Sequence, residues 1–355
     1  MSPTYHFWWN SMVRFLLLPL ILSGCFLFKE DKVTVGVVYS SPNELPVNKT
    51  VAHHFPDLGS ITDLANSEKG LVAVGFDGYV VVGLDQSQAK VKPHHESLSR
   101  RATNLTISLD HELWFVDETA GWSPLILINE GGEIVVDDKR FSPSRGFGHR
   151  AANGELRYYF ADIDQGLCFR TVKDQKPTCR DVYVKHIERY DYNNDGKNDF
   201  LVSTLPEGFK VVNEDLMPLG KIPYDGVTAG FSVLKNGLLS KGPELVFREY
   251  GKIVLTDIAG KSLAAIEDPD IENSSHFPAL VVKNSSGAPF LVVNEGPYFW
   301  RNMTRLIILD RNLKVLYKEV LFCSRPHLLA DPKGDGFYVG DAEGKVLHYQ
   351  LKAPM

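Results

Sequence analysis

Short apolar runs alternate with short polar or glycine-containing turns along most of the chain. Seven segments share one form, in which an apolar run of three or four residues is followed by a turn and a second apolar run. They begin at residues 71, 113, 157, 200, 245, 290 and 337, so consecutive starts lie 42 to 47 residues apart. A period of about 44 residues is typical of a propeller blade with four strands. The pattern therefore predicts an all-β protein with a seven-bladed β-propeller.

The apolar runs have no polar face, so each sheet must be covered on both sides by its neighbours. Closing the sheets into a ring meets this need and protects the edges. Only eight residues follow Leu347, so the seventh blade lacks a strand, and the β-like segment 32–40 is expected to complete it. A stack of β-sandwiches or a β-solenoid is the alternative. No amphipathic helix of 10–15 residues is evident after residue 33.

The first 25 residues have the form of an export signal. Arg14 precedes the apolar run 15–22, and the small residues Ser23 and Gly24 come just before Cys25. The run is too short for a membrane span, which needs about 20 apolar residues. Either Met1 or Met12 can be the start.

The segment Leu22-Ser23-Gly24-Cys25 resembles the bacterial lipobox, which implies cleavage before Cys25 and lipidation of that cysteine. The alternative is an ordinary signal followed by a chance cysteine. Phe26, rather than Asp, resembles the pattern of outer-membrane lipoproteins. We therefore expect a bacterial cell-envelope location, in the outer membrane.

Length and charge refine this picture. A typical domain has about 150 residues, so a chain of 355 residues would ordinarily contain two domains. With 1–25 as a signal peptide and 26–32 as a tether, residues 33–355 instead fit a single propeller domain. The net charge of −6 argues against a nucleic-acid partner, because phosphate-backbone binding favours a basic surplus.

An oxygen-rich loop precedes the apolar run at residue 200. Asp191, Asn193, Asp195 and Asp199 occupy its positions 1, 3, 5 and 9, and the carbonyl of Lys197 adds an oxygen at position 7. Ca²⁺ takes six to eight oxygen ligands, and a loop of this spacing brings alternate side chains together. The alternative is a plain turn, since Asp, Asn and Gly are common turn residues.

This loop resembles the calcium loop of FG-GAP/VCBS repeats in integrin-like propellers, which leads directly into a strand. The resemblance implies that Asp191, Asn193, Asp195 and Asp199 are side-chain ligands of one structural Ca²⁺. It covers the blade architecture over most of the chain, but the intact loop occurs only once. The matching segment 331–336 keeps Asp331 and Asp335 but has Lys333 at position 3, so we expect no good metal site there.

Basic residues recur in the connections between repeats and are candidates for a ligand-binding channel mouth. Such a mouth would suit a carboxylate-bearing glycan or an acidic protein loop. The alternative is that these side chains cap loop carbonyls or lie in water. The candidates are Arg100, Arg101, Arg145, His149, Arg150, His186, His276, Arg325 and His327.

The cysteines other than Cys25 bear on the compartment. Cys168 and Cys179 flank a turn at nearly equal distances, so they can lie opposite each other on adjacent strands. Export makes a disulfide between them possible. Cys323 remains unpaired and is expected to be a buried thiol.

The sequence contains no G-x-S-x-G elbow, no H-E-x-x-H, no P-loop and no Rossmann G-x-G-x-x-G after a strand. The leading hypothesis is an envelope-anchored lipoprotein whose propeller is a binding platform for an envelope protein or glycan. The alternative is a polysaccharide lyase or hydrolase, in which Arg neutralises a uronate carboxylate and His abstracts a proton. A third reading, assembly of outer-membrane proteins, resembles quinoprotein-like lipoprotein propellers, whose tryptophan-docking repeats are not evident here.

Overall fold

The computed structural model describes most of the chain after residue 35. The chain divides into two compact units, 1–34 and 35–355, and the description below concerns the second. The described residues are 36–40, 45–67, 70–83, 91–93, 103–107, 113–117, 125–128, 134–138, 144–162, 165–171, 173–174, 176–181, 184, 186–197, 199–204, 208–224, 230–249, 251–267, 278–296, 303–323 and 327–353. None of the helices found in these ranges is long and apolar enough to cross a membrane.

Nearly all regular structure in these ranges is β-strand, and a short 3-10 helix, η1 (Pro56–Leu58), is the exception. Four of the sheets contain only strands that are consecutive in the chain and lie before residue 223. They are β3 (Ile61–Ser67), β4 (Gly70–Gly75), β5 (Gly78–Gly83) and β6 (Lys92–Pro93); β7 (Thr103–Ile107), β8 (Leu113–Asp117), β9 (Leu125–Ile128) and β10 (Ile134–Asp138); β11 (Ser144–Arg150), β12 (Leu156–Asp162), β13 (Gly166–Thr171) and β14 (Thr178–Arg180); and β15 (His186–Tyr190), β16 (Asp199–Thr204), β17 (Gly208–Val212) and β18 (Pro218–Ile222).

The later part of the chain forms the remaining sheets, two of which recruit strands from near residue 40. They are β19 (Phe231–Leu234), β20 (Glu244–Glu249), β21 (Lys252–Asp257) and β22 (Ser262–Glu267); β23 (Ala279–Lys283), β24 (Pro289–Glu295), β25 (Met303–Leu309) and β26 (Val315–Phe322), with β1 (Gly36–Ser40) added; and β27 (Leu329–Ala330), β28 (Gly336–Gly340) and β29 (Lys345–Leu351), with β2 (Val47–His54) added.

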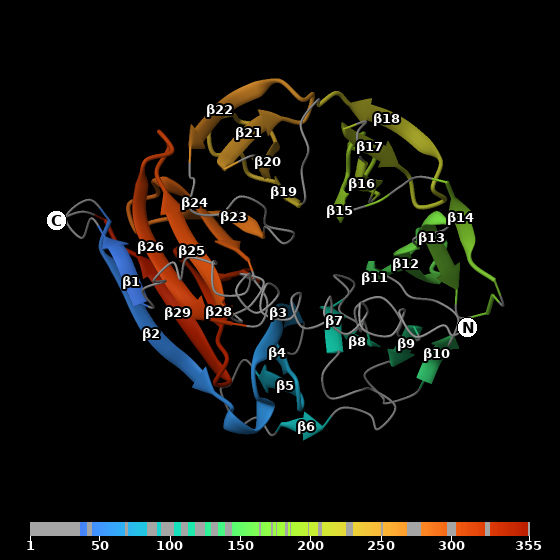
Figure 1. Ribbon diagram of the computed structural model, residues 1–355, viewed down its shortest axis with the longest axis horizontal. Helices are drawn as coiled ribbons and strands as arrows, with labels where there is room; N and C mark the ends of the chain where they lie inside the picture. Colours follow the sequence, from blue (N-terminus) through green and yellow to red (C-terminus); the bar gives the residue numbers. More distant parts are fainter. Residues whose placement is uncertain are drawn as a thin grey trace, which may run out of the picture. The chain divides into compact units, whose positions relative to one another are not determined.

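The sheets follow one another as the blades of a β-propeller. The inner strands β3, β7, β11, β15, β19 and β23 contact their neighbours in that order, and β28 contacts both β23 and β3. Figure 1 shows these inner strands toward the middle, with β6, β10, β14, β18 and β22 on the outside. Each sheet repeats the same inner-to-outer order, so the inner strands run in the same direction along the propeller.

The prediction of seven like blades closed by the segment 32–40 is wrong. The sheets are six four-stranded blades and one five-stranded sheet. Strand β1, within the segment 32–40, is the fifth strand of the β23–β26 sheet, and β2 completes the sheet of β27–β29. The pattern missed β2 because six of its eight residues are exposed, so it carries no apolar periodicity.

The core lies between neighbouring sheets, where the middle strands are buried on both faces. All seven residues of β25 are buried. One cluster joins Val246 of β20 to Leu291 of β24, and another joins Val292 of β24 to Phe337 of β28. This two-sided burial explains why the apolar repeats show no polar face.

Candidate functional site

The oxygen-rich loop connects β15 to β16, and its side chains accept backbone N–H groups. Asp191 Oδ1 and Oδ2 accept from Asp195 (3.1 Å) and Gly196 (3.0 Å), and Asn193 Oδ1 also accepts from Asp195 (3.0 Å). Asp195 Oδ1 accepts from Lys197 (2.8 Å). Gly196 has a φ of 81°, which disfavours any side chain there.

Asp199 lies at the base of this loop and is 3% exposed. Its Oδ2 accepts the N–H of Tyr192 at 3.1 Å. Burial raises the pKa of Asp199 above its ordinary value, and the charges of Asp195 and Asp191 raise it further. The loop thus gathers oxygen atoms and negative charge at one place.

The loop's donor chemistry suits a hard cation, since its donors are all oxygens and each carboxylate oxygen has more than one lone pair. Among the described residues, no three His, Cys, Asp or Glu side chains are grouped to hold a metal ion. A Ca²⁺ ion here would therefore also need the side-chain oxygen of Asn193 and the carbonyl of Lys197.

His149 lies near the end of β11 and is 4% exposed. Its Nε2 is 3.4 Å from Glu214 Oε2, and its ring packs edge-on against Phe200 with centroids 5.8 Å apart. Glu214 Oε2 also accepts the N–H of Ala152 at 3.0 Å. His149 therefore belongs to the contact between the β11–β14 and β15–β18 blades.

His186 begins β15 and is partly buried. Its Nε2 is 3.2 Å from Glu188 Oε1, on the same strand. Its ring lies edge-on against Phe231 of β19, with centroids 4.9 Å apart. This histidine packs between two neighbouring inner strands.

His327 precedes β27 and is 6% exposed. Its Nε2 accepts the N–H of Gly340 at 2.8 Å, so the neutral ring carries its proton on Nδ1. Nδ1 lies 3.9 Å from Sγ of Cys323, which is buried, as the sequence predicts, and is not part of the disulfide. Because Nδ1 already holds the proton, this imidazole is not arranged to deprotonate the thiol.

The described members of the candidate channel mouth lie at two ends of the inner strands. His186 and His327 lie at or just before the start of β15 and β27, and Arg145 is the second residue of β11. His149 and Arg150 end β11, so they lie at the opposite face of the propeller. The other members, Arg100, Arg101, His276 and Arg325, lie outside the described residues, as does Cys25.

A buried ionic cluster that the sequence does not predict lies between two blades. Glu295 of β24 bridges Arg248 of β20 and Arg305 of β25, and all three residues are at most 3% exposed. Arg248 Nε and Nη2 lie 2.6 and 2.8 Å from Glu295 Oε2 and Oε1, and Arg305 Nε lies 2.7 Å from Oε1. The available signal was a charge at the end of each apolar run. Pairing across 47 residues could not be inferred from it.

A second buried carboxylate lies where β2 joins the propeller. Glu319 of β26 accepts hydrogen bonds from Tyr317 (2.6 Å) and Tyr349 (2.9 Å) and an ion-paired bond from Lys49 of β2 (2.5 Å). Burial raises the pKa of Tyr317 and of Tyr349, and the Glu319 carboxylate adds to both shifts. This cluster ties the closing strand to the neighbouring sheet.

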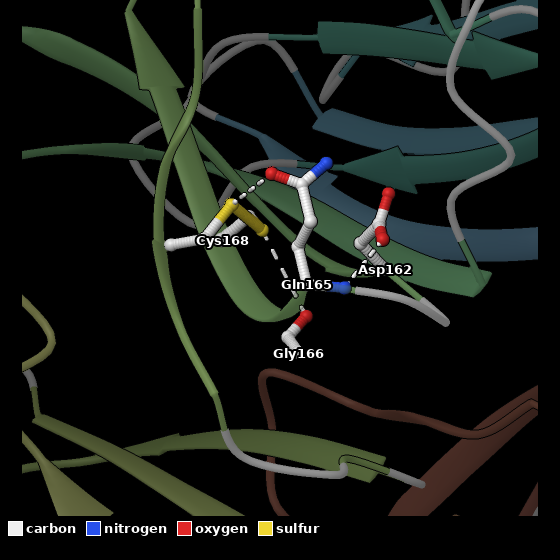
Figure 2. The surroundings of a disulfide bond; sticks show 5 residues. Asp162, Gln165, Gly166 and Cys168 are labelled. Atoms are coloured by element: carbon white, nitrogen blue, oxygen red, sulfur yellow. Dashed lines mark hydrogen bonds between the residues drawn. A yellow bond between two sulfur atoms is a disulfide. The ribbon is translucent and has the colours of Figure 1, made fainter.

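Cys168 and Cys179 form a disulfide between β13 and β14, shown in Figure 2. The two residues are directly opposite partners in the antiparallel ladder. The bond therefore fastens the outer strand of its blade to the next strand inward.

No protein-family model matches the chain. No curated protein matches it either. Among solved structures, the chain is similar to a catalytically inactive variant of virginiamycin B lyase from Staphylococcus aureus, determined with quinupristin. The TM-score is 0.55 at 15% identity, over 86% of this chain and 99% of the lyase chain. At this identity the likeness concerns the fold alone. Structure and comparison together identify the chain as a β-propeller protein.

Proposed function

We propose that this chain is an envelope-anchored lipoprotein whose β-propeller is a binding platform for an envelope protein or glycan. The observation that carries the proposal is the state of the described histidines of the candidate mouth. His149 and His327 are buried, and His186 packs between Glu188 and Phe231. These imidazoles hold the fold together, so they are poorly placed to serve as a shared catalytic base.

Exposed apolar side chains on outer strands supply contact area for a platform. Met217 (47% exposed) directly precedes β18, Leu219 (41%) lies on β18, and Val51 (55%) lies on β2. When a partner covers apolar side chains that were exposed to water, the free energy of the system falls, which favours binding. Met217 and Leu219 are only two residues apart in the chain, which makes the β18 edge of this blade the first place to test.

In the first step, the full-length protein is solubilised in detergent and immobilised, and an envelope extract is passed over it. The same solubilised protein is also applied to a glycan array. Each captured component is then purified and titrated against the chain by calorimetry. We expect saturable binding that Leu219→Asp weakens and that Val51→Asp, the matched control on another blade, leaves unchanged. No saturable binding to any component would overturn the proposal.

A lyase is the second candidate, and the propeller fold, which virginiamycin B lyase shares, is compatible with such an activity. Acidic polysaccharides and quinupristin are the probes, with products followed by mass spectrometry. The platform proposal predicts unchanged probe masses over a long incubation. New products that a buffer control lacks would establish the enzyme reading instead.

The proposal includes one structural Ca²⁺ at the loop of Asp191, Asn193, Asp195, Lys197 and Asp199. A bound cation would neutralise the crowded carboxylates and stabilise the folded state by linkage. Calorimetry with Ca²⁺ should show one site that Asp195→Ala abolishes. Asp335→Ala, in the matching loop of the last blade, is the control and should leave the heats unchanged. Equal heats for wild type and Asp195→Ala would exclude the site.

The anchor is tested separately at Cys25. Cells fed an alkyne fatty acid should label the wild-type chain but not Cys25→Ser, and only the wild-type chain should partition into detergent. Labelling of both chains would contradict lipidation at this cysteine.

A further inference from the structure

The Cys168–Cys179 disulfide is the main attachment of a very short strand. Strand β14 has only three residues, and it pairs with β13 through Leu167↔Arg180, Cys168↔Cys179 and Phe169↔Thr178. It is the outermost strand of its blade, and two of its three residues are exposed. Three backbone residue pairs stabilise β14 only slightly compared with the conformational entropy lost when the strand is ordered. The disulfide must therefore supply much of the attachment.

The two sulfurs differ in their access to solvent. Cys168 is completely buried, whereas Cys179 is partly exposed on β14. An attacking thiolate therefore reaches Cys179 first.

The sequence around the accessible sulfur is rich in basic residues. Residues 170–181 contain Arg170, Lys173, Lys176 and Arg180 against two aspartates, in a chain whose net charge is −6. Nearby cations attract thiolates and lower thiol pKa values, which favours exchange.

Both sulfurs also lie next to a carbonyl oxygen. Gln165 Oε1 is 3.5 Å from Cys179 Sγ, and the backbone oxygen of Gly166 is 3.8 Å from Cys168 Sγ. Figure 2 shows both contacts beside the disulfide. After reduction, the Gly166 oxygen can accept a hydrogen bond from the Cys168 thiol, which stays on β13.

We propose that Cys168–Cys179 is a thiol–disulfide exchange site, at which a dithiol reductant releases strand β14. A thiolate of the reductant attacks Cys179 Sγ, the S–S bond breaks, and Cys168 leaves as a thiolate that takes a proton from water. The second thiol of the reductant then attacks the mixed disulfide and frees Cys179. The protein gains two electrons and two protons, and the reductant leaves as a disulfide.

Release of β14 changes a defined part of the surface. It uncovers the edge of β13 and removes Arg180 from Met217, where Nη2 now lies 3.0 Å from Sδ. Strands β11, β12 and β13 keep their own pairing, so the opening is confined to one blade edge. This inference concerns chemistry that the proposed binding function does not require, so either can fail without the other.

The experiment uses the oxidised full-length protein, titrated with dithiothreitol and then alkylated. Peptide mass spectrometry should show alkylation of Cys168 and Cys179 at reductant levels that leave the circular dichroism spectrum unchanged. Hydrogen exchange should then rise in 176–181 and not in β16 or β17. Alkylation only after global unfolding, or unchanged exchange in 176–181 after reduction, would overturn the proposal.

Three variants test the proposal further. The double variant Cys168→Ser, Cys179→Ser should show the fast exchange of 176–181 with and without reductant, while Cys323→Ser, the control, should respond as wild type does. Lys176→Glu with Arg180→Glu should slow the reduction several-fold, most strongly at low salt. An unchanged rate would overturn the part assigned to the basic side chains.

Discussion

At the scale of single residues, Glu295 shows how the propeller keeps charges in its interior. One carboxylate accepts from two guanidinium groups on different strands, and Arg248 reaches it from the neighbouring blade. A buried charge is tolerated only when it is paired and hydrogen-bonded. The cluster therefore makes two blades depend on one side chain.

Replacing Glu295 by Gln should destabilise the protein strongly, because two buried guanidinium groups would lose their counter-charge. The expected loss is about 3–5 kcal/mol of unfolding free energy, measured by urea titration. The control is Glu267→Gln, which breaks an exposed pair with Lys252 at 3.4 Å and should cost less than about 1 kcal/mol. Similar losses for the two variants would contradict the buried role of Glu295.

At the scale of elements, β1 and β2 contribute unequally to the completion of their sheets, although both come from near residue 40. Strand β1 adds a fifth strand to a sheet that already has four. Strand β2 instead supplies the fourth strand of its sheet and pairs with β29 from Val47↔Leu351 to His54↔Lys345. The blade of β27–β29 has no other outer strand among the described residues.

Two truncated chains separate these roles. A chain that starts at Leu45 lacks β1 and should keep a melting temperature close to that of the chain from residue 26. A chain that starts at Phe55 also lacks β2, exposes the edge of β29 and removes Lys49 from Glu319. It should melt many degrees lower in a thermal scan, or aggregate. Equal melting temperatures for the two truncations would rule out a closing role for β2.

At the scale of the whole molecule, the propeller closes through contacts between sheets that are distant in sequence. Lys49 of β2, Tyr317 and Glu319 of β26, and Tyr349 of β29 meet at this closure. Burial raises the pKa of both tyrosines. The free energy of unfolding should therefore depend on pH in the alkaline range.

The direction of this dependence follows from the protons that each state binds. Above pH about 10 the unfolded chain loses its tyrosine protons, whereas folded Tyr317 and Tyr349 keep theirs. Unfolding free energy should be constant with respect to these groups below pH about 9 and fall above pH about 10, by up to about 1.4 kcal/mol per pH unit for each tyrosine. Urea titrations between pH 8 and 11 would measure this, and Tyr317→Phe should flatten the fall. A free energy that stays level to pH 11 would contradict the raised pKa values.

The local sequence pattern predicts part of the candidate site. The spacing of Asp191, Asn193 and Asp195 indicates a tight loop, because alternating Asx side chains bond to nearby backbone N–H groups. The structure shows those bonds. It places the recurrent basic residues differently from the expected single mouth, since His149 lies at the opposite end of its strand from His186. Their spacing in the sequence could not show this, because the repeats detected were the middle strands of each blade.

The sequence by itself predicted an all-β propeller, since two-sided apolar runs at a constant period of about 44 residues need neighbouring sheets on both faces and match a four-stranded blade. Tertiary structure alone decided the number of strands in each sheet, which segment closes the last one, and which buried charges meet. Outer strands such as β2 and β14 are chosen by backbone hydrogen bonds to an available edge, and those bonds leave no apolar pattern. Partners such as Arg248 and Glu295 meet only because two blades pack face to face, so their pairing is a property of the ring and not of either strand.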